Sequence, residues 1–374
     1  MKALYLSGKT LELRDDHPRP EPALGEVLVQ VIRAGICETD LQLIQGYMGF
    51  EGILGHEFVG IAESGKHAGQ RVVGEINCSC WNCDTCRSGL PTHCPNRSVL
   101  GILKHDGAFA ELIAVPENNL HVVPESLSTD EAVFVEPLAA AYQILKQDLV
   151  KRNDSVVILG DGRLGNLCAQ VLSDYGCHVL VVGKHEEKLG VLRGLNTSIR
   201  TAHLDDVTPD RSADVVVDCT GSATGLPTAL QHVKPWGTVI LKTTVAGEQT
   251  MALAPIVIDE VRIVGSRCGP FADALTGLQS GRINVQPLID GRYPIDEAIE
   301  AIQTTATTPV LKILLDIATG SPAATTAPFP DTPHVTSAGN QPIRTMGSID
   351  ESTTSRGHRP DRFIALTDST TTLA

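Results

Sequence analysis

The spacing of hydrophobic and polar positions changes once along the first 318 residues. Up to about residue 147, short apolar runs alternate with turn residues, as in a β-rich region. The runs 27–31, 58–61, 71–74 and 109–115 are the expected strands. One longer segment, 129–145, has apolar residues at helical spacing, and Ser128 followed by Glu131 predicts a capped helix start.

From about residue 153 the pattern becomes a regular alternation of strands and helices, which predicts a parallel sheet covered on both faces. The expected strands are 155–159, 178–182, 213–218, 237–241 and 262–265, and the expected helices are 163–175 and 186–193. A helix at 296–303 and a strand at 310–317 follow. The fold class is therefore α/β, with a β-rich first part (1–147), a doubly wound parallel sheet (148–268) and a final segment (269–318).

Residues 319–374 differ in composition from everything before them. They are rich in Ser, Thr, Pro and Ala and contain no long apolar run. Such a segment buries too little apolar surface to offset the entropy lost on ordering, so we predict a disordered tail.

Charge and cysteine content narrow the functional classes. The formal net charge is −14 and no Lys/Arg-rich run occurs, which argues against nucleic acid or an anionic membrane surface as a partner. No stretch approaches the ~18 apolar residues of a membrane span, and the first residues lack the apolar core of a signal peptide. Ten cysteines are then better explained as metal ligands and reduced thiols than as disulfides. We expect a cytoplasmic enzyme.

Four of the cysteines have the spacing of a closed metal site. Cys80, Cys83, Cys86 and Cys94 follow the pattern C-x2-C-x2-C-x7-C, separated by turn-forming residues. Four thiolates close a tetrahedral shell around zinc and leave no position for a substrate, so the lobe 78–94 is predicted to be structural. Cys78 lies outside the pattern and is expected to be a spare buried thiol.

A glycine-rich loop follows the first strand of the alternating region. The strand 155–159 leads into Gly160-Asp161-Gly162-Arg163-Leu164-Gly165 and then into a helix. In that context G-x-G-x-x-G predicts a dinucleotide site. Gly160 permits the tight turn, Gly162 the approach of a pyrophosphate, and Gly165 the close packing of helix on strand.

The end of the second strand bears on the choice of cofactor. NAD-binding domains usually place Asp or Glu there to accept the ribose hydroxyls. This chain has Gly183-Lys184-His185 instead. A small residue followed by two potential cations favours the 2′-phosphate of NADP, although NAD remains the alternative if Lys184 is merely solvated.

Three further segments carry residues that could form a second metal site. Cys37 lies just after a strand, His56 and Glu57 follow 19 residues later between glycines, and Glu136 precedes a proline at a helix start. Each is weak alone. Together with the cysteine lobe and the glycine-rich loop, in this order, the chain resembles the zinc-dependent medium-chain dehydrogenases, the superfamily of alcohol, sorbitol and threonine dehydrogenases.

The resemblance covers residues 1 to about 318. It implies a GroES-like catalytic domain interrupted by a Rossmann cofactor domain, two zinc ions per chain, and NADP or NAD as cofactor. Cys37, His56 and Glu136 match ligands of the catalytic zinc, and Glu57 matches the carboxylate behind the metal that enters the coordination shell in some members. Thr39 matches the hydroxyl that relays the substrate proton, and Asp40 the carboxylate that orients the ligand histidine.

Two positions depart from the family pattern. Gln42 stands where many relatives carry a histidine that completes a proton relay, and Glu38 stands where relatives often have Gly or Arg. The expected activity is hydride transfer between NAD(P) and an alcohol or polyol, or the matching carbonyl. The alternatives are an NAD-dependent enzyme of the threonine dehydrogenase type and a catalytically silent binding protein. The expected assembly is a homodimer or homotetramer.

Overall fold

The computed structural model describes residues 1–195, 198–242, 244 and 250–318, all of which belong to one compact unit, Met1–Thr325. The predicted tail, 319–374, lies outside the described residues. Within the described ranges no helix is long and apolar enough to cross a membrane.

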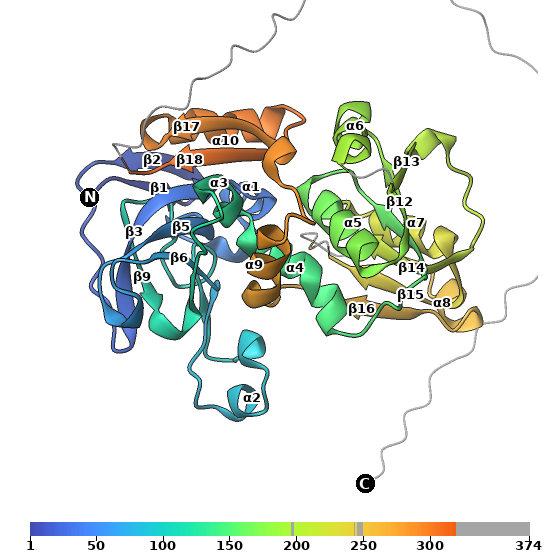
Figure 1. Ribbon diagram of the computed structural model, residues 1–374, viewed down its shortest axis with the longest axis horizontal. Helices are drawn as coiled ribbons and strands as arrows, with labels where there is room; N and C mark the ends of the chain where they lie inside the picture. The colour runs from blue at the N-terminus through green and yellow to red at the C-terminus, as the bar shows by residue number, and fades with distance from the viewer. Residues whose placement is uncertain (196–197, 243, 245–249, 319–374) are drawn as a thin grey trace, which may run out of the picture. The chain divides into compact units, whose positions relative to one another are not determined.

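A seven-stranded sheet forms the centre of the β-rich part (Figure 1). Its path is β10 (Leu120–Val122), β6 (Arg71–Gly74), β5 (Glu57–Ala62), β3 (Glu26–Gly35), β18 (Lys312–Asp316) and β17 (Ile289–Pro294), with β9 (Leu112–Pro116) also paired to β3. β3 alternates buried and exposed positions along much of its length, as a strand with one buried face should. Because β18 and β17 join this sheet, the last described segment of the chain packs beside the first.

Smaller elements complete this part. A second sheet has the order β2 (Thr10–Arg14), β1 (Ala3–Ser7) and β4 (Gly52–Ile53), and β7 (Asn77–Cys78) pairs with β8 (Ser98–Val99). The helices are α1 (Glu38–Ile44), α2 (Asp84–Arg87), α3 (Thr129–Val133), α4 (Val135–Lys146), α9 (Phe271–Gln279) and α10 (Ala298–Thr307). This mixture agrees with the predicted α/β class.

The middle of the chain forms a six-stranded sheet in which all strands are parallel. The order is β13 (Arg200–His203), β12 (His178–Gly183), β11 (Ser155–Leu159), β14 (Ala213–Asp218), β15 (Val233–Leu241) and β16 (Arg262–Gly265). The helices are α5 (Arg163–Tyr175), α6 (Glu186–Leu195), α7 (Gly225–His232) and α8 (Ala254–Ile258). The strand order places the first βαβ unit, β11–α5–β12, at the centre of the sheet, as in a Rossmann domain.

Most predicted elements are present, and several have different limits, such as the strand predicted over 237–241, which begins at Val233. The helix predicted over 129–145 is broken at Phe134 into α3 and α4. Pro137 has no N–H to donate to the carbonyl of Val133, so the continuous helical ladder is interrupted there. The strand predicted from residue 109 begins at Leu112, and the helix predicted from 296 begins at Ala298. The predicted cap of Ser128 and Glu131 is confirmed, with the Glu131 amide donating to the Ser128 hydroxyl at 3.2 Å.

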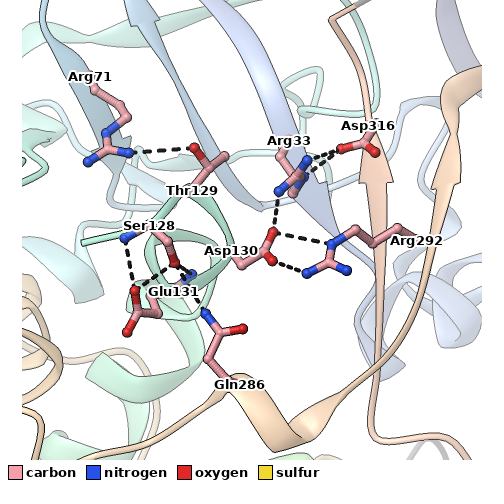
Figure 2. A network of polar contacts seen from close by, with 9 residues as sticks. All are labelled: Arg33, Arg71, Ser128, Thr129, Asp130, Glu131, Gln286, Arg292 and Asp316. Atoms are coloured by element: carbon pink, nitrogen blue, oxygen red, sulfur yellow. Dashed lines mark hydrogen bonds and ion pairs between the residues drawn. The ribbon is translucent and has the colours of Figure 1, made fainter. Parts of the chain in front are cut away.

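An ion-pair network joins the final strands to the rest of the β-rich part (Figure 2). The Asp130 carboxylate on α3 accepts from Arg33 of β3 and from Arg292 of β17. Arg33 also pairs with Asp316 of β18. Because Asp130 is 9% exposed, its charge would be poorly solvated without these two guanidinium groups.

Replacing Asp130 with alanine is expected to lower the free energy of unfolding by about 3 kcal/mol, since two part-buried guanidinium groups lose their shared partner. Urea denaturation measures the change. The exposed pair Arg14–Glu12 supplies the control, and Glu12→Ala should cost less than about 1 kcal/mol. Equal effects of the two substitutions would show that the network does not hold the strands together.

Candidate active site

Cys37 is placed by the end of a strand and the start of a helix. β3 ends at Gly35, and Cys37 is the N-cap residue of α1. The Asp40 carboxylate accepts the Cys37 backbone N–H at 2.8 Å, which fixes this turn. Thr39 lies beside it, with Oγ1 3.8 Å from the Cys37 Sγ.

His56 and Glu57 are brought to Cys37 by the register of two antiparallel strands. Gly35 of β3 pairs with Glu57 of β5, so the residue before Glu57 lies near the residues that follow Gly35. Gly55 makes the turn into β5 with a φ of +94°, where a Cβ would lie 2.4 Å from the Phe109 ring. Only glycine fits this combination of backbone conformation and close packing.

These residues form a cluster suited to a metal ion. Ligand atoms of Cys37, His56 and Glu57 all lie within 4.8 Å of one another. His56 Nδ1, Glu57 Oε1 and Asp40 Oδ1 are buried without a hydrogen-bond partner, and the first and last are 3.5 Å apart. Buried polar atoms are rarely left unpaired, and thiolate, imidazole and carboxylate are the ligands of catalytic zinc. The donor set therefore fits zinc.

Glu136 lies outside that three-residue cluster but close to it. It is the second residue of α4, and burial, reinforced by the charge of Glu57, raises its pKa to about 7. A protonated His56 would lower the pKa of this carboxyl group. Glu136 is thus near the other candidate ligands, and the cluster itself contains Glu57 as its carboxylate.

Two basic residues behind the cluster were not identified from the sequence. Lys312 of β18 is fully buried, donates to the Glu57 carboxylate and lies 3.3 Å from the Ile36 carbonyl oxygen. Arg163, from the glycine-rich loop, donates to the Leu311 carbonyl at 2.9 Å. Burial opposes its charge, but Glu57 and Cys37 raise the pKa of Arg163. For Lys312 the available signal was a lysine between Leu311 and Ile313, in an otherwise apolar run.

The acidic residue at position 38 has a local partner. The Gln42 side-chain amide donates to the Glu38 carboxylate at 3.2 Å, one turn further along α1. Both positions that depart from the family pattern therefore contact each other, and Glu38 is exposed.

The four-cysteine lobe forms a second, closed cluster. Sulfur atoms are 3.5 Å apart for Cys83 and Cys86, 3.8 Å for Cys83 and Cys94, and 3.4 Å for Cys94 and Cys80. Tetrahedral zinc with ~2.3 Å bonds to sulfur requires separations of about 3.8 Å, so the set fits a structural zinc. Cys78 is not part of this cluster of sulfur atoms, and burial raises its pKa to about 12.

The glycine-rich loop has the shape that a dinucleotide needs. Gly160 has a φ of +113°, and a Cβ on Gly165 would lie 2.0 Å from the Gly160 carbonyl oxygen, so both positions require glycine. A Cβ on Gly162, at the start of α5, would meet nothing within 4 Å. There is therefore open space beside Gly162 at the N-terminus of α5, the kind of position where a pyrophosphate binds. Leu164 packs against the apolar core.

Gly183 and Lys184 lie at the carboxyl end of β12, next to this loop. Both line a cavity of about 130 Å³ together with Gly160, Asp161 and His185. Ligands of open parallel sheets bind at this end of the strands. The cavity is thus suited to the adenosine half of a dinucleotide.

Comparison with known proteins identifies the families to which two parts of the chain are similar. Residues 23–125 match the family described as alcohol dehydrogenase GroES-like domain, and residues 164–279 match the zinc-binding dehydrogenase family. Sorbitol dehydrogenase of Halalkalibacterium halodurans is 28% identical over 80% of this chain and 94% of its own length. L-threonine 3-dehydrogenase of Legionella pneumophila is 28% identical over 80% of this chain and 95% of its own.

Solved structures give the same result. A zinc-binding dehydrogenase of Sinorhizobium meliloti 1021 bound to NADP superposes with a TM-score of 0.76, at 28% identity over 84% of this chain and 98% of that one. An Escherichia coli CFT073 alcohol dehydrogenase complexed with NADH also has a TM-score of 0.76, at 25% identity over 85% and 99%. This protein belongs to the zinc-containing medium-chain alcohol dehydrogenase superfamily and is an oxidoreductase that acts on CH–OH groups.

Proposed function

We propose that the chain oxidises an alcohol or polyol, or reduces the matching carbonyl compound, with NADP as the preferred cofactor. The observation that carries the proposal is the Cys37–His56–Glu57 cluster, whose possible ligand atoms lie within 4.8 Å of one another and whose buried Glu57 Oε1 has no hydrogen-bond partner. A catalytically silent relative would have no need to keep this donor set intact.

The chain's own residues have distinct roles in this proposal. Asp40 faces His56 Nδ1 and so leaves the opposite ring nitrogen for the metal, while it also holds the Cys37 turn. Thr39, beside Cys37, accepts the proton of the substrate hydroxyl. When bound, zinc supplies Lewis-acid activation of that hydroxyl and the nicotinamide accepts the hydride. Gln42 cannot titrate, so the proton leaves Thr39 by water rather than through that side chain.

The two buried carboxylates, Glu57 and Glu136, have different roles in the proposal. Lys312 occupies Glu57 Oε2 and leaves Oε1 unpartnered. Although burial opposes ionisation, Lys312 and Arg163 lower the pKa of Glu57. Glu57 therefore stays anionic and can exchange between the metal and the lysine. We assign Glu136 as the third protein ligand, as in the polyol and threonine branches of the family.

Substrate and cofactor preference are tested by steady-state kinetics on a panel of alcohols, polyols and L-threonine. Similarity to a sorbitol dehydrogenase supports a polyol, and similarity to an L-threonine 3-dehydrogenase supports the amino-alcohol alternative. NADP is supported by Lys184 and His185 at the end of β12. A higher kcat/KM with NAD, or with L-threonine, would overturn the corresponding part of the proposal.

A homodimer or homotetramer is supported by an apolar surface near an edge strand. β16 is the last strand of the parallel sheet. Val257 and Ile258 of α8 precede it in sequence, Trp236 belongs to the neighbouring strand β15, and all three are at least 73% exposed. Exposed edge strands and apolar patches are sites of association. Val257→Glu with Ile258→Lys is expected to lower the mass measured by light scattering; an unchanged oligomeric mass would exclude this surface.

A further inference from the structure

The space above Gly183 is filled by a carboxylate from another part of the chain. A Cβ on Gly183 would lie 2.4 Å from Oδ2 of Asp161, the residue between the first two glycines of the loop. Asp161 is 5% exposed and lines the same cavity as Lys184 and His185. The end of β12 thus has no acidic residue of its own, but an acidic side chain from the loop lies against it.

Asp161 binds the segment after β12 through several donors. Its Oδ2 accepts the backbone N–H of Lys184 at 2.6 Å and that of His185 at 2.7 Å. Its Oδ1 lies 3.0 Å from His185 Nδ1. Burial alone would raise the pKa of Asp161, but the hydrogen bonds from His185 and Lys184 lower it below its usual value.

These contacts determine the orientation of the His185 ring and which ring nitrogen donates to Asp161. An ionised carboxylate can only accept hydrogen bonds, so His185 must donate from Nδ1. Its Nε2 then lies on the far side of the ring, and the side chain is 45% exposed at the edge of the cavity. At metal and catalytic sites, a carboxylate that accepts from one ring nitrogen orients an imidazole side chain in this manner.

We propose that Asp161 is a positioning residue for cofactor selection: it accepts from His185 Nδ1, so that the ring, protonated on both nitrogens in the complex, donates from Nε2 to the 2′-phosphate of NADP beside the Lys184 ammonium group. This inference rests on the proposed preference for NADP. On this proposal the preference for NADP over NAD depends on Asp161, a residue of the glycine-rich loop, and not on a residue of β12.

The test compares two probes on the zinc-loaded full chain by calorimetry: adenosine 2′,5′-bisphosphate and adenosine 5′-monophosphate. The wild-type protein should bind the bisphosphate more tightly. Asp161→Asn should reduce this preference about tenfold, because a charge-assisted hydrogen bond to phosphate is lost or misplaced. His185→Gln should reduce it to a similar extent.

Asp205→Asn is the matched control. It removes one negative charge from the same region, where Asp205 is exposed and lies 3.6 Å from His203, whose ring contacts the Lys184 carbonyl. The preference should stay within about twofold of wild type, because Asp205 does not contact His185.

The outcomes separate the two proposals. A wild-type protein without preference for the bisphosphate would contradict the choice of NADP and the contact assigned to His185. An intact preference that Asp161→Asn leaves unchanged, or increases by removing a repulsive charge, would overturn only the role of Asp161. Nitrogen NMR of wild-type His185 gives a second readout, independent of folding of the variant: Nδ1 should be protonated with and without the bisphosphate, and Nε2 should also be protonated in the complex. A ring without a proton on Nδ1 would overturn the positioning.

Discussion

Replacement of Cys37 by alanine is expected to lower kcat/KM at least about 10³-fold and to reduce the zinc content from two ions per chain to one. The two clusters use separate residues, so loss of the thiolate should empty the Cys37–His56–Glu57 site and leave the cysteine lobe loaded. Lewis-acid activation lowers the activation barrier by several kcal/mol, and each 1.36 kcal/mol of barrier is a factor of about ten in rate. Steady-state kinetics and elemental analysis of the same preparation measure both quantities.

Cys78→Ala is the matched control for this change. Cys78 is also a part-buried thiol of the β-rich part, but it belongs to neither cluster. The control should keep both zinc ions and near wild-type turnover. Retained turnover in the Cys37 variant would contradict the assignment of the catalytic site, and loss of both ions would contradict the independence of the two clusters.

The second large effect is expected in the lobe. Cys94→Ser should release the structural zinc and unfold the segment around α2, because the four sulfur atoms lie in a short stretch whose small helices bury few apolar side chains. Structural zinc contributes folding free energy directly. Limited proteolysis should then cut between residues 78 and 97, where the wild-type chain resists cleavage.

The zinc that remains in the Cys94 variant should be the catalytic one, which a visible spectrum after cobalt substitution would identify. Cys78→Ser serves as the control, since it makes the same chemical change at a thiol outside the cluster. Protection from protease in the Cys94 variant would show that the lobe folds without its metal. Loss of cobalt binding at the catalytic site would show that the two sites are coupled.

Strand limits and helix caps were predictable from the sequence because they depend on residues that lie next to one another or a few positions apart. The strand limits at 155–159 and 213–218 agree with the structure because compact apolar runs are bounded by polar residues. The cap at Ser128 was predictable from residues three apart. The break at Phe134 was missed because apolar periodicity continues through it, although Pro137 was a usable warning.

The candidate site was predictable only where the spacing of residues carried the signal. The four lobe cysteines lie within 15 residues of sequence, and their cluster followed from spacing. Lys312 contacts Glu57 across 255 positions, a contact that depends on the pairing of β18 with β3. Asp161 reaches His185 across 24 positions through the packing of parallel strands. Such pairings cannot be derived from periodicity in a single sequence.

The central claim is that hydride transfer depends on zinc held by Cys37 and His56, and zinc titration tests it most directly. The protein is stripped of the catalytic zinc while the lobe stays loaded, and zinc is then added back during turnover of the best alcohol or polyol. We predict that formation of reduced cofactor is absent at one zinc per chain and rises in proportion to the second, reaching its limit at two. Full turnover at one zinc per chain, or none at two, would contradict the claim.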